Sequence, residues 1–307
     1  MIQQIIILLV GFIFLVKGAD WFVDGAASIA RKMGIPQLII GLTIVAMGTS
    51  MPEAAVSITA AMQQNAGITI GNVVGSNILN IFIILGITAL ITNVKIQKST
   101  IRYEIPFMIF ITIILMIFGM TDMKINFIEG VSLWILFIAY LVYLFIMARN
   151  SETQEEEKDI PVWKCLLFIL IGGILVVKGS DFAVSGASAI ARYFGMSERF
   201  IGLTIVAFGT SLPELVTSVT AAKRGNAGIA IGNIVGSNIF NILFVIGTTS
   251  LICSVPFESK FMIDSMIAVI AGLVLWFGTM KHKELRKPCG IIMLLCYGLY
   301  FMYLCLM

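Results

Sequence analysis

Long apolar segments with few charges recur along the whole chain. Residues 105–119, 128–147 and 262–278 each contain at most one charged residue, and such segments approach the roughly 20 residues that cross a bilayer as a helix. Shorter polar stretches separate them. The pattern predicts ten membrane-spanning helices, over residues 2–24, 37–62, 67–92, 104–120, 127–147, 162–184, 198–222, 227–253, 261–279 and 288–306.

The composition agrees with a membrane protein. Of the 307 residues, 59% are hydrophobic and only 12% are charged, whereas a soluble domain carries about 25% charged residues. So few charges cannot cover a water-facing surface, which excludes the soluble enzyme classes. We therefore expect an all-α polytopic protein of the cell (inner or cytoplasmic) membrane, in contact with the lipid bilayer. No basic run is interleaved with aromatic residues, which argues against a nucleic-acid partner, and the sequence indicates no obligate protein partner.

The chain consists of two homologous halves. Residues 16–91 align with residues 177–252 without a gap, at a constant offset of 161 positions, and about 45 of these 76 positions are identical. Such self-similarity indicates a repeated structural unit. Because residues 1–24 have an internal copy, we interpret them as the first span and not as a cleavable leader. We predict a first five-helix unit over 1–148, an acidic linker over 149–161 and a second five-helix unit over 162–307.

Five spans in each half mean that the second half enters the membrane from the opposite side. The loops after spans 1, 3, 5, 7 and 9 carry 14 lysine and arginine residues, against four in the loops on the other side. Positively charged loops face the cytoplasm. We therefore predict two inverted repeats, as in many secondary transporters, with both termini outside and the linker 149–161 in the cytoplasm.

Each half carries one carboxylate near the middle of an otherwise apolar span. Glu53 and Glu214 each end a Gly-Thr-Ser-x-Pro-Glu segment. An ionisable side chain at this depth is costly and is expected to face a cavity or a partner. The proline removes a backbone donor, so we expect both helices to break there and leave carbonyls free. These are the carbonyls of Ala46, Thr49, Ala207 and Thr210, with the hydroxyls of Thr49, Ser50, Thr210 and Ser211 at the same depth.

The next span of each half supplies further polar groups. A Gly-Ser-Asn-x-x-Asn segment occurs once in each half, and its serine and second asparagine share one helix face. These pairs are Ser76 with Asn80 and Ser237 with Asn241. Carboxylate, hydroxyl, amide and carbonyl oxygens are hard ligands that suit Ca²⁺, Na⁺ or Mg²⁺ better than zinc or copper. We therefore predict helices 2, 3, 7 and 8 to be interrupted or packed around an ion site in mid-membrane.

Other interpretations of the polar residues are weaker. A single serine or asparagine in a membrane helix more often bonds a neighbouring helix than an ion. For Asn77 and Asn238 we therefore give a hydrogen bond between helices at least as much weight as ion binding. An intramembrane hydrolase using Ser50 or Ser211 lacks an activating base, since the only histidine, His282, lies outside the spans.

A lysine and an aspartate three residues apart also recur in the two halves. The pairs are Lys17 with Asp20 and Lys178 with Asp181. Residues at this spacing are neighbours on a helix surface. We therefore expect two local ion pairs and leave them out of the ion site.

The paired motifs resemble the sodium/calcium exchanger family, part of the cation/Ca²⁺ antiporter superfamily. Each Gly-Thr-Ser-x-Pro-Glu segment is followed about 22 residues later by Gly-Ser-Asn-x-x-Asn, and the match extends over nearly the whole chain, in the manner of the ten-span prokaryotic members. The resemblance implies that Ca²⁺ binds Glu53 and Glu214 with the carbonyls of Thr49 and Thr210. It implies flanking Na⁺ sites formed by Ala46, Ser50, Ser76 and Asn80 on one side and by Ala207, Ser211, Ser237 and Asn241 on the other.

The resemblance also implies secondary active antiport by alternating access, with spans 1 and 6 sliding against the rest. In some members, including potassium-dependent exchangers, the last residue of the second Gly-Ser-Asn-x-x-Asn segment is replaced by aspartate. Here this residue is Asn241, which carries no charge, so we expect K⁺-independent exchange. Two ionised glutamates neutralise one Ca²⁺, whereas three Na⁺ leave one excess charge, so exchange at the family's usual ratio is expected to be electrogenic. The alternative is a Ca²⁺/H⁺ antiporter using the same glutamates, although proton-coupled relatives carry Gly-Asn-x-x-Glu cores. We expect no enzyme activity and no cofactor, because Ca²⁺ and Na⁺ are transported substrates.

Overall fold

The chain folds as a helical membrane bundle. The computed structural model describes residues 2–64, 66–150, 161–195 and 207–306. Eight helices in this part are long and apolar enough to cross a membrane, and a ninth segment is a pair of helices bent by 50°. The predicted span over 198–222 lies partly outside the described residues, as does most of the predicted linker. The prediction of an all-α polytopic membrane protein is confirmed.

The elements follow the same order in the two halves. The first half contains α1 (Ile2–Lys32), α2 (Gln37–Ile40), the π-helical turn η1 (Gly41–Val45), α3 (Ala46–Thr49), α4 (Met51–Met62), the 3-10 turn η2 (Ala66–Ile68), α5 (Thr69–Leu79), the π-helical turn η3 (Asn80–Leu85), α6 (Gly86–Ile91), β1 (Val94–Lys95), the π-helical turn η4 (Thr100–Glu104), α7 (Ile105–Asp122), β2 (Lys124–Ile125) and α8 (Phe127–Arg149). The second half contains α9 (Val162–Tyr193), α11 (Ala207–Thr210), α12 (Leu212–Lys223), α13 (Ala227–Phe240), the π-helical turn η6 (Asn241–Ile246), α14 (Gly247–Ile252), β3 (Val255–Pro256), α15 (Ser259–Met280), β4 (Glu284–Leu285) and α16 (Lys287–Leu306).

The helices that carry the two Gly-Ser-Asn-x-x-Asn segments form the centre of the bundle. In the most apolar stretch of the span of α13, η6 and α14, 94% of the residues are buried, against 72% in the span from η2 to α6 and only 22% in α8. Apolar residues on all sides of a helix are expected where it is surrounded by other helices. Polar groups on α5 and α13 therefore lie far from lipid.

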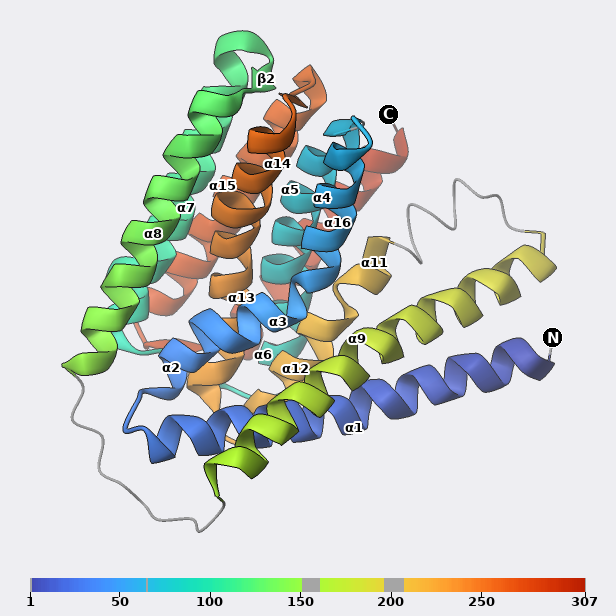
Figure 1. The fold of residues 1–307 in the computed structure, drawn as a ribbon, viewed down its shortest axis with the longest axis vertical. Helices are drawn as coiled ribbons and strands as arrows, with labels where there is room; N and C mark the ends of the chain where they lie inside the picture. Colours follow the sequence, from blue (N-terminus) through green and yellow to red (C-terminus); the bar gives the residue numbers. More distant parts are fainter. Residues whose placement is uncertain (1, 65, 151–160, 196–206, 307) are drawn as a thin grey trace.

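Helices α1 and α9 are longer than predicted. They continue to Lys32 and Tyr193, which is eight and nine residues beyond the predicted ends. A helix of 31 residues is about 46 Å long, more than the roughly 30 Å of the hydrocarbon core, so we infer that both helices cross it at a tilt. Figure 1 shows them side by side, at a steep angle to α7, α8 and α15.

Glycines spaced by seven residues join α1 to α9. A Cβ atom on Gly18 would lie 2.8 Å from the Val176 nitrogen, and one on Gly179 would lie 2.6 Å from the Leu15 nitrogen. Small residues let membrane helices approach this closely. The sequence analysis did not predict this seam, which we call the glycine seam. Its members are Gly11, Gly18 and Gly25 on α1 and Gly172, Gly179 and Gly186 on α9.

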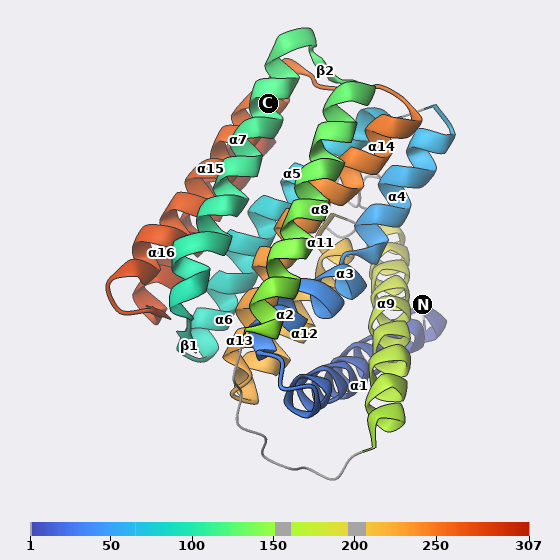
Figure 2. The same ribbon diagram turned by 60° about the vertical axis from the view of Figure 1, so that its left-hand side comes forward.

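Two short β-ribbons join loops from different halves. β1 pairs with β4, with Val94 opposite Leu285, and β2 pairs with β3, with Ile125 opposite Val255. Figure 2 shows β1 and β2 at opposite ends of the bundle. The loop after α6 therefore lies on the same side as the loop between α15 and α16, and the loop between α7 and α8 lies on the other. An inverted repeat requires this arrangement.

An ion pair ties α1 to the connection between α12 and α13. Arg224 Nη2 donates to Asp20 Oδ1 at 2.7 Å, and Arg224 Nη1 donates to Asp24. The pair predicted between Lys17 and Asp20 is therefore wrong, because the Arg224 guanidinium takes the Asp20 carboxylate. The second predicted pair, Lys178–Asp181, forms at 3.3 Å.

Candidate ion-binding site

The helix that carries Glu53 breaks just before it. α3 ends at Thr49 and α4 begins at Met51, with Ser50 at φ −86° and ψ 7° between them. Pro52 lies in the first turn of α4, where proline is tolerated because its missing N–H has no helical partner. The predicted break is confirmed, and it places Glu53 at a helix N-terminus.

The second half repeats this geometry. α11 and α12 are separated by Ser211, with φ −91° and ψ 4°, and Glu214 lies in the first turn of α12. The N-terminus of a helix carries a partial positive charge that favours a carboxylate. Two helix N-termini therefore support the two buried glutamates.

The two carboxylates lie within electrostatic reach of each other. Glu53 and Glu214 are each only 1% exposed, and the Glu53 carboxylate acts electrostatically on Glu214. Ser50 Oγ donates to Glu214 Oε1 at 2.9 Å, which is a contact between the halves. Thr210 and Ser76 flank the Glu53 carboxylate. The structure thus brings predicted ligands from α3, α4, α5, α11 and α12 to one place.

Four asparagines join α5 to α13 beside the glutamates. Asn77 Nδ2 donates to the Asn238 carbonyl, and Asn238 Nδ2 donates to the Asn77 carbonyl, both at 3.1 Å. Asn80 Nδ2 donates to Asn238 Oδ1 at 3.0 Å, and Asn241 Nδ2 donates to Asn77 Oδ1 at 3.1 Å. Asn77 and Asn238 therefore hold the helices together, in agreement with the reading of them as interhelical contacts. The same bonds turn the Oδ1 atoms of Asn80 and Asn241 away from this network.

Several buried oxygen atoms in these segments have no hydrogen-bond partner among the described residues. They are Glu53 Oε1 and Oε2, Glu214 Oε2, Asn80 Oδ1, Asn241 Oδ1 and Ser211 Oγ. Buried polar atoms nearly always have a partner, and a desolvated carboxylate needs a counter-charge. The described residues contain no group of three or more acidic, histidine or cysteine side chains able to hold a metal. A cation here therefore depends on two carboxylates and on neutral oxygens.

The Ala46 carbonyl is not free, contrary to the prediction. It accepts the Ser50 amide at 3.0 Å and the Ser237 hydroxyl at 3.4 Å, and the Thr49 hydroxyl lies at the same distance from it. The amide of Ser50 precedes the proline and keeps its helical partner, so the break does not release this carbonyl. A carbonyl oxygen has two lone pairs, so it can accept a bond from Ser237 in addition to that from the Ser50 amide. This contact places Ser237, the Na⁺ ligand predicted on α13, next to α3.

The remaining predicted ligands lie on the expected elements. Thr49 Oγ1 also donates to Asn233 Oδ1 at 2.9 Å. Asn80 and Asn241 each begin a π-helical turn, η3 and η6, a feature common at functional sites. Ala207 begins α11, directly after residues that the structure does not describe.

Two asparagines that the prediction left out of the site fix the glutamate backbones. Asn72 Nδ2 donates to the Glu53 carbonyl at 3.2 Å, and Asn233 Nδ2 donates to the Glu214 carbonyl at 3.4 Å. Their second acceptors are Ser57 Oγ and Ser218 Oγ, each at 2.9 Å. Each asparagine follows its glutamate by 19 residues, and this repetition was a signal that could have identified them.

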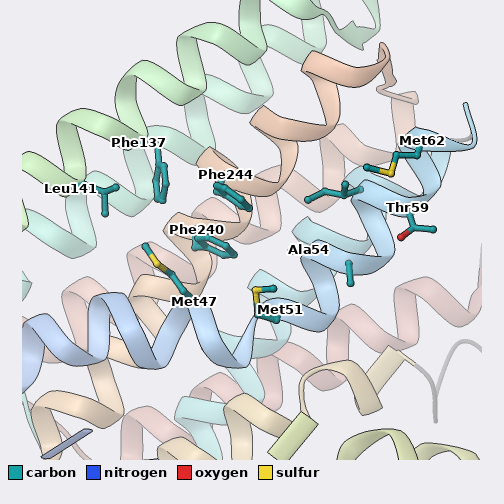
Figure 3. A pocket seen from close by; sticks show the side chains of 11 residues that line it. Met47, Met51, Ala54, Thr59, Met62, Phe137, Leu141, Phe240 and Phe244 are labelled. Atoms are coloured by element: carbon teal, nitrogen blue, oxygen red, sulfur yellow. The ribbon is translucent and has the colours of Figure 1, made fainter. Parts of the chain in front are cut away.

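An apolar cavity lies alongside α4 but does not belong to the ion site. It has a volume of about 520 Å³, and Figure 3 shows Met47 and Met51 on one side of it and Phe137, Phe240 and Phe244 on the other. No charged side chain of the described residues lines it, and thioether and aromatic groups are poor ligands for Na⁺ or Ca²⁺. The candidate ion site is instead the group of polar side chains around Glu53 and Glu214, between the two halves.

Comparisons with known proteins agree with this geometry. The family described as "Sodium/calcium exchanger protein" matches residues 3–146 and 164–306. The putative antiporter CaxA of Alkalimonas amylolytica is 39% identical over 297 residues, covering 94% of this chain and 93% of CaxA. The sodium/calcium exchanger MaX1 of Methanosarcina acetivorans is 31% identical over 334 aligned positions, covering 95% of each chain. A solved structure of the sodium-calcium exchanger NCX_Mj superposes with a TM-score of 0.87 at 36% identity, covering 99% of each chain.

Proposed function

We propose that this chain, which belongs to the sodium/calcium exchanger protein family and is therefore a Ca²⁺/cation antiporter of the membrane, uses Na⁺ as the counter-ion. The observation that supports the proposal most is the set of buried, unbonded oxygens on the glutamates and asparagines of the described residues. Oxygen ligands of this kind suit both Ca²⁺ and Na⁺. The proposal includes no chemical step on a substrate and no cofactor.

The charges of the site explain why the two ions compete. Glu53 and Glu214 together carry two negative charges when ionised, which one Ca²⁺ balances. Na⁺ ions at flanking positions share the same two carboxylates, so they cannot be bound together with Ca²⁺ without excess positive charge in a buried site. Release of one ion therefore permits binding of the other. Three Na⁺ in exchange for one Ca²⁺ move one net charge, worth about 2.3 kcal/mol per 100 mV.

Helices α1 and α9 are the proposed moving elements. The glycine seam holds them together backbone to backbone, and the ion pairs of Arg224 with Asp20 and Asp24 are contacts with α12 that must rearrange when α1 moves. We infer that they slide as one unit against the central helices, which exposes the ion site to each side in turn.

The driving ion is tested by Ca²⁺ flux. Purified protein in proteoliposomes is expected to accumulate ⁴⁵Ca²⁺ when an outward Na⁺ gradient is imposed at clamped voltage, and not when an outward H⁺ gradient of equal size is imposed. The reason is that the site offers several neutral oxygens suited to Na⁺ beside its carboxylates. Uptake driven by H⁺ alone would instead assign the chain to Ca²⁺/H⁺ antiport.

Exchange is expected to be independent of K⁺. Asn241 Nδ2 donates to Asn77 Oδ1. In Asn241→Asp this donor becomes a carboxylate oxygen that faces Asn77 Oδ1, and the site then holds three carboxylates. Such a group is expected to gain a proton or a monovalent cation. Ca²⁺ flux by the variant, measured across pH 6–8 with and without K⁺, should become more sensitive to pH than wild type, or newly sensitive to K⁺.

The control for this test is Asn226→Asp, at the start of α13 and outside the site. It should transport like wild type. A wild-type requirement for K⁺, or an Asn241→Asp variant indistinguishable from wild type, would contradict the assignment.

We propose that both termini face outside and the linker 149–161 faces the cytoplasm. The loop charges support this orientation, and the β-ribbons support the opposite placement of the two sets of loops. In a cysteine-free background, an impermeant thiol reagent is expected to label Lys124→Cys in intact cells and Lys281→Cys only after permeabilisation. Both positions are exposed, so the reverse pattern would invert the topology.

A further inference from the structure

A third buried carboxylate lies outside the ion site, where α7 begins and α8 ends. Glu104 is 1% exposed and is the last residue of η4. The Tyr143 hydroxyl donates to Glu104 Oε1, whereas Glu104 Oε2 has no hydrogen-bond partner in the described part of the chain. Ion exchange as proposed above gives this carboxylate no role.

A cavity of about 330 Å³ opens beside Glu104. Aromatic rings form its walls: Phe107 stacks on Tyr140 at 5.6 Å between centroids, and Tyr103 lies 6.4 Å from Tyr143. Arg102 also lines the cavity. Glu104 thus lies at a cavity lined by aromatic side chains, whose ring faces attract organic cations.

A hydroxyl on the wall of the cavity is also buried without a hydrogen-bond partner among the described residues. It is the hydroxyl of Tyr140. Together with Glu104 Oε2 it provides two acceptor atoms at the cavity. A primary ammonium group has three N–H donors, so two of them can bond these acceptors.

Arg102 supplies the opposite charge at the cavity. Its side chain is exposed, its guanidinium lies 5.5 Å from the Tyr103 ring centroid, and no carboxylate of the described residues forms an ion pair with it. A guanidinium in this situation suits a phosphate, which it binds through two parallel hydrogen bonds. The site therefore fits a zwitterion with an ammonium group and a phosphate.

The position of the cavity favours a membrane lipid as the source of this zwitterion. It lies close to the polar ends of the spans, four residues from the start of η4 and six residues before Arg149, at the level where tyrosines meet lipid headgroups. Along the same stretch of α8, Ile138, Val142 and Phe145 are between 52% and 69% exposed, to acyl chains in a membrane. A bare metal ion fits poorly, because the site has one carboxylate and a volume far above the roughly 30 Å³ of a water molecule.

We propose that this cavity binds the headgroup of an ethanolamine phospholipid, with its ammonium group at Glu104 and its phosphate at Arg102. The site is separate from the ion site, so the proposal does not depend on which ion drives exchange.

The test is lipid retention by the purified full-length protein, measured by native mass spectrometry. Phosphatidylethanolamine, phosphatidylcholine and phosphatidylglycerol with identical acyl chains are offered in detergent. Wild type is expected to retain phosphatidylethanolamine about tenfold better than phosphatidylcholine, which has no N–H donor for the charge-assisted bonds. Glu104→Gln should remove this preference, and Arg102→Gln should weaken retention of all three lipids while leaving the preference in place.

Asp264→Asn is the matched control in the second half. Asp264 accepts from the Tyr300 hydroxyl at 3.0 Å near the start of α15, so the variant loses a carboxylate bonded to tyrosine at a different place and should keep the preference. Arg102 is exposed, so Arg102→Gln is informative even if Glu104→Gln fails to fold. Equal retention of phosphatidylethanolamine and phosphatidylcholine by wild type, equal effects of Glu104→Gln and Asp264→Asn, or displacement of the lipid by K⁺ or by free phosphoethanolamine at similar concentrations would overturn the proposal.

Discussion

Glu53→Gln and Glu214→Gln are each expected to lower Ca²⁺ exchange by at least about a hundredfold. Removing one partner from a buried set of opposite charges costs about 3 kcal/mol or more, and about 2.7 kcal/mol corresponds to a factor of a hundred in affinity. Glutamine keeps the size of the side chain and one oxygen, so the change tests the charge. The measurement is Na⁺-driven ⁴⁵Ca²⁺ uptake into proteoliposomes.

Glu258→Gln provides the control for these variants. Its carboxylate is about half exposed, pairs with Lys260 and lies outside the ion site, so transport should stay at the wild-type level. Gel filtration in detergent verifies that each variant is folded. Near-normal exchange by either buried variant would remove the glutamate pair from the mechanism.

The helix breaks and the buried glutamates could be predicted from the sequence because their signals are local. Glu53 is a charge in an apolar span, and Pro52 predicts a break in the same turn. Both features repeat at the same offset in the second half. The carbonyl of Ala46 was misjudged because backbone donors before a proline keep their helical partners, and only the contact geometry shows that Ser50 and Ser237 donate to it.

Contacts between distant segments were harder to predict. Nothing near Asp20 in the sequence points to Arg224, which lies 204 residues away, so the local partner Lys17 was preferred. The β-ribbons are too short to leave a pattern of alternating residues. Helices α1 and α9 were predicted too short because apolarity marks the hydrocarbon core, whereas a tilted helix continues beyond it.

The two halves share their residues but not all their contacts. Ser50 donates to Glu214 at 2.9 Å, whereas the equivalent hydroxyl of Ser211 has no partner in the described residues and neither does the Glu53 carboxylate. The two repeats therefore differ locally at the serines although their sequences match there.

Gly18→Ala is expected to destabilise the protein and to impair transport, although alanine favours helices. The added Cβ would lie 2.8 Å from the Val176 nitrogen and 2.8 Å from Leu175 Cβ, so α1 and α9 must separate. Overpacking of this kind costs about 1–3 kcal/mol, which exceeds the gain of roughly 0.5–1 kcal/mol from replacing a helical glycine. The melting temperature in detergent should fall, and Na⁺-driven Ca²⁺ uptake should fall with it.

Gly298→Ala separates the effect of the glycine seam from that of helix propensity. Gly298 also lies within a helix, α16, but a Cβ there meets no described atom within 4 Å. This variant should be as stable as wild type or slightly more stable, with unchanged transport. If α1 and α9 move as one unit, Gly179→Ala on the facing helix should reproduce the loss seen with Gly18→Ala. Wild-type stability and transport in both seam variants would show that the two helices do not depend on this close approach.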